Sequence, residues 1–224
     1  TMPEAPATSI ANASAHAAAK GVDALIAMAA SYDLDATCEH FYFLRHGQTP
    51  CNASRIFQGP DEPLSDLGVR QAKAAAGVLA SHSIATIVCS SMRRAQQTAA
   101  LVASEHAMTP VDHSGVRERH FGALIGTSSA QIDWACAPEG GETLAAFVAR
   151  TCLGLNQALA HASPTLVVAH GGTLYVLTAL LGLGLDQRLI GNAHPLLFSR
   201  RDNSWAVTAL VPVQIDAGSA ANLA

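Results

Sequence analysis

Short apolar runs alternate with segments of helical periodicity from residue 40 onward, and this alternation restricts the fold more than any other feature of the chain. Strands are expected at His40–Arg45, Ile84–Cys89 and Thr165–Ala169, with a short extended segment starting at Val111. Helices are expected at 64–83, 142–161 and 173–181, with another one ending near His106. Such alternation predicts an α/β protein, with a three-layer α/β/α sandwich around a mostly parallel central sheet.

Some element boundaries carry local signals of their own. Ser65 can cap the helix at 64–83, and Ser90 or Ser91 can cap the helix that ends near His106, because a serine hydroxyl accepts from a free amide at a helix start. Toward the end of the chain, Leu196–Ser199 and Trp205–Val211 are expected to form a hairpin. These elements place one domain over residues 38–224.

Residues 1–37 differ from the rest, since they are rich in Ala, Ser and Pro and poor in large apolar side chains. The range 14–31 can form a helix with Val22, Leu25, Ile26 and Ala29 on one face. We interpret residues 1–37 as an Ala-rich N-terminal extension that forms a helical arm. A poorly ordered extension is the alternative that the composition leaves open.

The bulk composition argues against several classes of partner. A net charge of −4 with 13% charged residues lacks the basic surplus of a nucleic-acid-binding protein. No apolar run reaches membrane-spanning length, and no secretory signal is recognisable. The five cysteines are scattered and form no C-x-x-C pair, which favours free thiols in the cytoplasm over disulfides or a zinc site. The oligomeric state stays open, and a dimer is one alternative.

Basic side chains and glycines follow the expected strands directly. The first strand ends in Arg45-His46-Gly47, the second leads to Arg94, and the third ends in His170-Gly171-Gly172. Ligands of open α/β sheets bind at the carboxyl ends of the strands. Both histidines and at least two arginines are therefore expected on one rim of the sheet, where helix starts would add amides that favour an anion.

This combination of side chains points to phosphate chemistry. Arginine binds phosphate oxygens in a bidentate fork and keeps its charge, and a neutral imidazole can attack phosphorus. Each signal alone has an ordinary structural explanation, such as a histidine that only donates a hydrogen bond or a glycine pair that only forms a turn. Their joint occurrence at successive strand ends favours a site that holds a phosphoryl group with Arg45 and accepts it on His46.

Six stretches in order carry a more specific signal. They are LRHGQTPCN at 44–52, DEPLSDLG at 61–68 with QA at 71–72, CSSMRRAQQT at 89–98, RERHFG at 117–122, GGET at 140–143 and AHGG at 169–172. Together they resemble the signatures of the histidine phosphatase superfamily, which has the phosphoglycerate mutase-like fold. The resemblance runs from about Phe41 to Val211, and it implies a metal-independent phosphomonoesterase that needs no cofactor and acts on a small phosphorylated metabolite.

The resemblance also implies roles for individual residues. His46 would be the nucleophile that forms a phosphohistidine, and Glu118 would be the proton donor and later the base that activates water. The phosphate pocket would be completed by Arg45, Arg94 and His170. Thr49, Asn52, Glu142 and Asn192 would line or brace the pocket, and Gly171 would be a further substrate-binding position. Arg55, Arg119 and His120 could contact the rest of the substrate.

Two alternatives remain beside the phosphatase interpretation. The stretch ERHFGALIG at 118–126 is closer to the mutase version of this segment, so a cofactor-dependent phosphoglycerate mutase-like phosphotransferase is one alternative. The short window Thr127–Pro138 argues against it, because it contains no Arg or Lys to grip a bisphosphorylated intermediate. Trp134 in this window is either part of an apolar lid or part of the core. A non-catalytic phosphate-binding protein is the second alternative, although the five expected catalytic side chains are all present.

Overall fold

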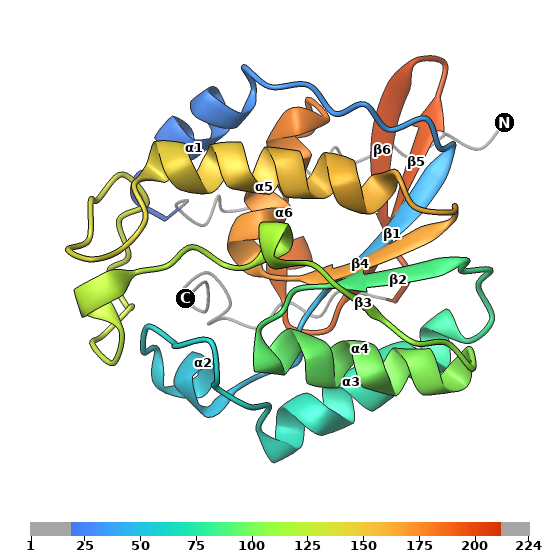
Figure 1. The fold of residues 1–224 in the computed structure, drawn as a ribbon, viewed down its shortest axis with the longest axis horizontal. Helices are drawn as coiled ribbons and strands as arrows, with labels where there is room; N and C mark the ends of the chain where they lie inside the picture. The colour runs from blue at the N-terminus through green and yellow to red at the C-terminus, as the bar shows by residue number, and fades with distance from the viewer. Residues whose placement is uncertain (1–18, 212–224) are drawn as a thin grey trace, which may run out of the picture.

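The structure, a computed structural model, describes residues 19–211 and has a six-stranded sheet between two layers of helices (Figure 1). The strands are β1 His40–Arg45, β2 Thr86–Cys89, β3 Val111–Asp112, β4 Thr165–Ala169, β5 Pro195–Arg201 and β6 Ser204–Ala209. The α-helices are α1 Val22–Ala29, α2 Pro50–Ser54, α3 Asp66–Leu79, α4 Arg93–Glu105, α5 Leu144–Leu159 and α6 Gly171–Leu180. Short 3-10 turns are η1 Ser114–Val116, η2 Gly122–Leu124 and η3 Gln187–Ile190.

The sheet has the strand order β3-β2-β4-β1-β5-β6. Strands β3, β2, β4 and β1 pair in parallel, whereas β5 and β6 are antiparallel and form the predicted hairpin at one edge. The predicted α/β class with a mostly parallel sheet is confirmed. The register pairs Arg45 with Ala169 and Cys89 with Val168, so the three central parallel strands end side by side.

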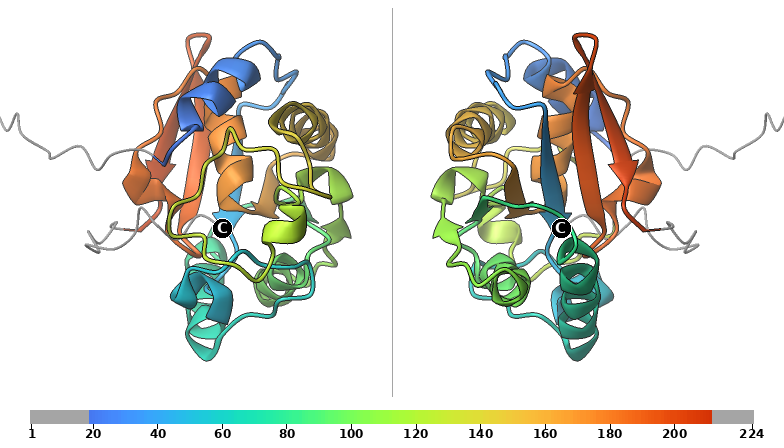
Figure 2. Two further views of the ribbon diagram at one scale, coloured as in Figure 1. Left: turned by 90° about the vertical axis from the view of Figure 1, so that its left-hand side faces the viewer. Right: turned by 90° about the vertical axis from the view of Figure 1, so that its right-hand side faces the viewer.

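The side chains of β1 alternate between the two faces of the sheet, as strand geometry requires. Phe41 and Phe43 belong to one core cluster with α1, α5 and α6, while Tyr42 and Leu44 belong to a second cluster with α3 and α4. Figure 2 shows the same arrangement from the side, with α5 and α6 on one face of the sheet and α3 and α4 on the other. The continuous apolar run of β1 thus reflects burial on both faces.

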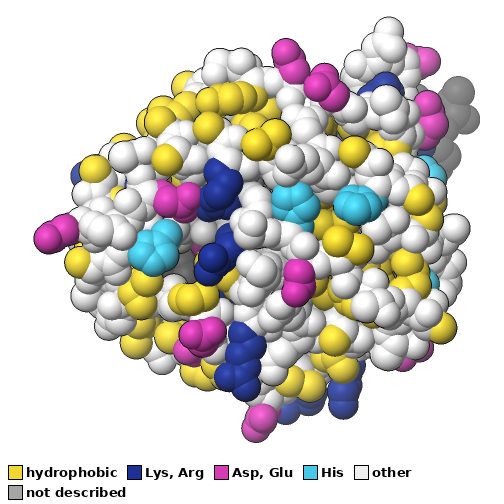
Figure 3. Space-filling view, in the orientation of Figure 1, with side chains coloured by type: hydrophobic (Ala, Val, Ile, Leu, Met, Phe, Trp, Pro, Cys, Tyr) yellow, Lys and Arg dark blue, Asp and Glu magenta, His cyan; other side chains and the backbone are white. Residues whose placement is uncertain are grey.

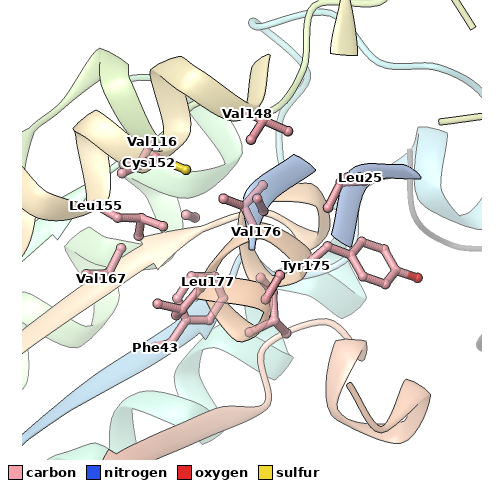
Figure 4. Packing of buried hydrophobic residues seen from close by; sticks show 14 of the residues in the cluster. Leu25, Phe43, Val116, Val148, Cys152, Leu155, Val167, Tyr175, Val176 and Leu177 are labelled. Carbon is pink, nitrogen blue, oxygen red and sulfur yellow. The ribbon is translucent and has the colours of Figure 1, made fainter. Parts of the chain in front are cut away.

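Helix α1 packs into the larger of these clusters. Its buried side chains Val22, Leu25 and Ala29 contact the core beneath α5 and α6, and Figure 4 shows Leu25 beside Val176 of α6. Ile26, predicted on the same face, is instead 37% exposed. The helix is shorter than the predicted range 14–31, of which 14–18 lies outside the described residues. The division of the chain at residue 37 stays a prediction, but α1 shares the core of the catalytic domain.

One of the two predicted serine caps is present in the structure and the other is absent. Ser65 caps α3, since its hydroxyl accepts from the amide of Gly68 at 3.0 Å. The prediction of a serine cap on α4 is wrong, because the N-cap residue is Met92 and it makes no side-chain cap. Ser90 accepts instead from the amide of Met92 at 3.2 Å and belongs to the site described below. No helix within residues 19–211 is both long and apolar enough to cross a bilayer.

Candidate active site

The two predicted histidines meet at the carboxyl ends of β1 and β4. The amide of His46 donates to the carbonyl of Ala169 at 3.0 Å, which continues the ladder by one residue beyond β1. His46 and His170 therefore leave neighbouring strands at the same level, with ring centroids 5.2 Å apart. Both side chains are buried. The parallel pairing of two strands thus brings together residues that are more than a hundred positions apart in sequence.

His46 is held as one tautomer by its surroundings. Its Nδ1 lies 2.7 Å from the carbonyl oxygen of Gly47, and a carbonyl can only accept, so Nδ1 carries the proton. The lone pair of Nε2 accepts from Nε of Arg94 at 3.2 Å. Burial, with the nearby charges of Arg94 and Arg45, lowers the pKa of His46 well below its ordinary value. The imidazole is therefore neutral, with a nucleophilic nitrogen directed at a guanidinium.

Gly47 lets the backbone pass very close to α3. A Cβ atom at this position would lie 2.3 Å from the carbonyl oxygen of Gly68, a distance that real side chains essentially never show. The amide of Gly47 also donates to the hydroxyl of Thr98 on α4 at 3.1 Å. The glycine after the histidine is therefore needed for close packing that fixes the strand end.

Two arginines provide buried positive charge beside His46. Arg45 and Arg94 are 3% and 1% exposed, respectively. Arg45 donates from Nη1 to the carbonyl of Ile190 at 2.7 Å, and Arg94 donates from Nη1 to the carbonyl of Gly59 at 2.9 Å. Burial lowers the pKa of each to about 10, so both stay charged at neutral pH. A dianionic phosphoryl group would compensate these two charges.

His170 is oriented by Ser90, a residue that the sequence indicated only as a helix cap. Its Nε2 lies 2.7 Å from the Ser90 hydroxyl, which itself accepts from the amide of Met92. A serine hydroxyl can donate as well as accept; when Ser90 donates its proton to Nε2, the neutral ring carries its own proton on Nδ1. That Nδ1 is buried and has no hydrogen-bond partner among the described residues. Burial, together with Arg94, His46 and Arg45, lowers the pKa of His170 well below its ordinary value.

Glu118 follows η1 and reaches the same rim, where it is 6% exposed. Its Oε2 accepts from the amide of Gly172 at 3.0 Å, and its Oε1 accepts from the amide of Arg119 at 2.9 Å. Burial raises the pKa of Glu118, although these two amides and the charges of Arg94 and Arg45 oppose the rise. The amide of Gly172, predicted to favour a ligand anion, binds the Glu118 carboxylate instead. A buried carboxyl with a raised pKa can give up a proton to a leaving group.

Thr49 and Asn52 brace the loop that follows His46. They form a capping box at the start of α2, in which the Thr49 hydroxyl accepts from the amide of Asn52 and the Asn52 side chain accepts from the amide of Thr49. Asn192, which precedes β5, donates from Nδ2 to the carbonyl of His46 at 3.0 Å. Thr49 and Asn52 are fully buried. Their placement agrees with the bracing role that the sequence allowed.

Arg119, a predicted substrate contact, is bound by backbone carbonyls of the chain itself. Its guanidinium is buried and donates to the backbone carbonyls of Trp134, Cys136 and Glu142 at 2.5–3.1 Å. All its nitrogens are therefore used to hold the irregular segment that follows η2. The structure thus gives Arg119 a structural role and does not place it in the lining of the cleft described below, while its contact with substrate stays a prediction.

Trp134 is part of the core, which decides between the two interpretations of this residue. It is completely buried and packs against Phe121, Phe147 and Tyr175. The interpretation as a lid residue is therefore wrong. Arg55, a further predicted substrate contact, is exposed at the end of α2 with a left-handed backbone (φ 53°) and does not line the cleft described next.

A cleft of about 300 Å³ opens beside Glu118. His120 and Glu142, both predicted at the substrate, line it, as do four residues that the sequence analysis did not single out, Met92, Ser114, Arg117 and Arg150. Glu142 is bound by Arg150 in a bidentate pair, with both N–O distances at 2.8 Å. On the face drawn in Figure 3, basic, acidic and histidine side chains surround a hollow, as such a lining requires.

The described residues offer no ready metal site. Within residues 19–211, no group of three or more His, Cys, Asp or Glu side chains lies close enough together to hold a metal ion. The pocket itself is built from two charged arginines and two neutral histidines, and the arginines attract an anion directly. Gly171, predicted in the pocket, is the buried first residue of α6, directly after His170.

Comparison with known proteins agrees with this geometry. The family model of the histidine phosphatase superfamily, branch 1, matches residues 41–211. A glucosyl-3-phosphoglycerate phosphatase of Mycolicibacterium vanbaalenii is 34% identical over 161 residues, which are 62% of this chain and 72% of that protein. A probable phosphoglycerate mutase GpmB of Yersinia pestis is 33% identical over 165 residues, which are 63% of this chain and 74% of that protein.

A solved structure gives the same result in three dimensions. The mycobacterial glucosyl-3-phosphoglycerate phosphatase in complex with VO3 has a TM-score of 0.63 and 31% sequence identity, and the match covers 78% of this chain and 99% of that chain. The family match covers more than half of the chain and includes every residue of the pocket. The protein therefore belongs to branch 1 of the histidine phosphatase superfamily and is a phosphoric monoester hydrolase.

Proposed function

We propose that the protein hydrolyses a small phosphorylated metabolite without a metal ion, through a phosphohistidine on His46. The observation that carries this proposal is the fixed neutral tautomer of His46, whose Nδ1 proton is held by the carbonyl of Gly47. Its Nε2 lone pair lies beside the charge of Arg94, where phosphate oxygens would bind. The other three charged or donor groups at the rim are Arg45, His170 and Glu118.

In the first step, Nε2 of His46 attacks phosphorus and forms the N–P bond. The bond between phosphorus and the ester oxygen breaks, and its electron pair stays on that oxygen. Glu118 supplies a proton to the oxygen, so the alcohol leaves neutral. Arg45, Arg94 and Nδ1 of His170 stabilise the charge on the transferring phosphoryl group, which is the largest contribution expected in phosphoryl transfer.

In the second step, water attacks the phosphohistidine. The Glu118 carboxylate accepts a proton from the water as the new P–O bond forms. The N–P bond breaks, and its electron pair returns to Nε2 of His46, which restores the free enzyme and releases phosphate. The raised pKa of Glu118 suits both steps, because the same group must donate a proton and then accept one.

The likeness to a probable phosphoglycerate mutase keeps a phosphotransferase as the second candidate. A mutase has to protect its phosphohistidine from water and hold an intermediate with two phosphate groups. The segment between Glu118 and Glu142 is short, and after Arg119 it contains neither Arg nor Lys. Its Trp134 is buried in the core and does not lie over the pocket. These features favour transfer to water.

The test is phosphate release from a panel of phosphomonoesters in the presence of EDTA. The panel includes glucosyl-3-phosphoglycerate, for which the mycobacterial relatives are named, and 3-phosphoglycerate. Release that persists in EDTA and disappears in His46→Ala supports the proposal, and the exposed His161→Ala serves as the matched control. Unchanged release in His46→Ala would contradict it. Isomerisation of phosphoglycerate that depends on added bisphosphoglycerate, without release, would support the mutase, and no turnover would support a non-catalytic phosphate-binding protein.

A further inference from the structure

The cleft beside Glu118 determines what the enzyme can accept beyond the phosphoryl group. Since Glu118 faces the ester oxygen in the proposed function, the alcohol part of the substrate has to occupy the cleft that Glu118 lines. A cleft of about 300 Å³ is at the small end of the range for small-molecule sites. The charged side chains that line this cleft therefore determine which alcohol parts of a substrate can bind.

Two arginines line the cleft, but only one has a charge without a counter-charge. Arg150 is neutralised by Glu142 in the bidentate pair, and its Nη1 also donates to the carbonyls of Gly115 and Arg117 at 3.0 and 3.1 Å. Arg117 takes part in no ion pair with any residue of 19–211. Its Nε is buried and makes no hydrogen bond with the described residues. A buried donor without a hydrogen-bond partner costs free energy. A ligand that accepts a hydrogen bond from Nε removes this cost and binds more tightly for it.

The backbone of Arg117 is fixed in position. Its carbonyl accepts from Arg150, and its amide donates to the carbonyl of Ser114 at 3.2 Å. The charge of Arg117 is also close enough to Arg94 to contribute to the lowered pKa of that residue. The backbone of Arg117 is therefore held in place, and its side chain lines the cleft within electrostatic reach of Arg94.

We propose that Arg117 determines specificity by binding a carboxylate on the alcohol part of the substrate. The preferred substrates are then phosphoric monoesters of hydroxy acids. A planar guanidinium fork matches a carboxylate with two parallel hydrogen bonds. As the one arginine of the cleft outside an ion pair, Arg117 also matches a monoanion better than a second phosphate, which would carry up to two charges. This assignment rests on the proposed function, because it takes Glu118 as the group at the ester oxygen.

The test uses two phosphonates that cannot be hydrolysed, so it does not depend on turnover. 4-Phosphonobutanoate carries a carboxylate, and 4-hydroxybutylphosphonate carries a neutral hydroxymethyl group in its place. Isothermal titration calorimetry of the wild type is expected to show about 10-fold or greater preference for the carboxylate, as one charged hydrogen-bonding pair would give. Arg117→Gln should lose this preference and still bind the neutral phosphonate with the affinity of the wild type, which also shows that the variant is folded.

Two further variants complete the experiment. Arg117→Lys should keep part of the preference, because it keeps the charge but not the fork, and it remains informative if the glutamine variant fails to fold. The matched control is Arg93→Gln, which removes an exposed arginine of α4 outside the cleft and should keep the full preference. Equal affinity of the wild type for both phosphonates, no binding of either, or a preference retained in Arg117→Gln would overturn the inference. Hydrolysis of an aryl phosphate, measured in parallel, reports separately on the proposed function.

Discussion

The carboxylate of Glu118 lies directly on the backbone of Gly172 at the start of α6. The Gly172 amide donates to Oε2 at 3.0 Å, and a Cβ atom at this position would lie 2.2 Å from Oε1. It would also lie 2.7 Å from Cη2 of Trp134, which is fixed in the core. The absence of a side chain at position 172 is therefore what allows the proposed acid to occupy its place beside His170.

Gly172→Ala should displace Glu118 and slow the step that needs a proton. General acid catalysis contributes roughly 100- to 10,000-fold, so we expect kcat for an alkyl phosphate to fall by at least about 100-fold. An aryl phosphate has a good leaving group and should lose far less, as it should in Glu118→Gln. Equal losses for both esters would contradict the role of Glu118 as the acid. The control is Gly77→Ala in α3, where a Cβ atom meets nothing within 4 Å and activity should not change.

The two buried histidines should make stability depend on pH. The pKa of His46 and of His170 lies well below the ordinary value in the folded protein, so the unfolded state binds protons more readily below about pH 6.5. The free energy of unfolding should therefore fall as pH decreases, by up to about 1.4 kcal/mol per pH unit for each histidine. Urea unfolding between pH 7.5 and 5.5 measures this slope. His170→Asn should reduce the slope of the free energy of unfolding against pH by the contribution of one histidine. A slope equal to that of the wild type would show that His170 does not stay neutral.

Arg119 should contribute to stability rather than to substrate binding. Arg119→Met removes the hydrogen bonds to the carbonyls of Trp134, Cys136 and Glu142, and we expect a loss of at least about 3 kcal/mol in the free energy of unfolding. The exposed Arg70→Met on α3 is the matched control and should change stability by less than about 0.5 kcal/mol. Denaturant unfolding of the two variants makes the comparison. A stable Arg119→Met variant with a raised KM would instead restore the predicted substrate contact.

Ser90 should act on catalysis through His170. Ser90→Ala removes the hydroxyl that lies 2.7 Å from Nε2 of His170 and frees the ring to change tautomer. We expect kcat to fall by about 10-fold, with Ser90→Thr recovering part of it, in line with the loss of one hydrogen bond. The ¹⁵N NMR signals of His170 should show Nδ1 protonated in the wild type and a mixture of tautomers in Ser90→Ala. An unchanged NMR spectrum would mean that Ser90 does not fix the ring.

The strands and their ends could be predicted because each carries a signal within a few residues. The run 40–45 is buried on both faces and stops where Arg45-His46-Gly47 begins, and β1 has the predicted bounds. Parallel strands end at the same edge, so the strand assignment places His46 and His170 on one rim, and the pairing of β1 with β4 then brings them together. The bracing of His46 by Asn192 could be expected only from the family resemblance, because no local pattern reveals the path of the loop before β5.

The segments without regular structure could be predicted only in part. Arg117 and Arg119 flank Glu118 in an irregular stretch with neither helical nor strand periodicity, so the sequence cannot tell which one turns to the cleft and which one to the carbonyls of the following segment. For the same reason Trp134 could be a lid or core residue until its neighbours were known. Ser90 was predicted as a cap because serine favours helix starts, but its hydroxyl serves His170 instead.

The most direct test of the central claim is to trap the covalent intermediate. A ³²P-labelled aryl phosphate is mixed with the enzyme, quenched in base within milliseconds and digested, and the labelled peptide is sequenced. The account predicts an acid-labile, base-stable phosphate on Nε2 of His46, absent from His46→Ala and formed at a rate no slower than turnover. Turnover without any labelled protein, or a label on another residue that persists in His46→Ala, would contradict it.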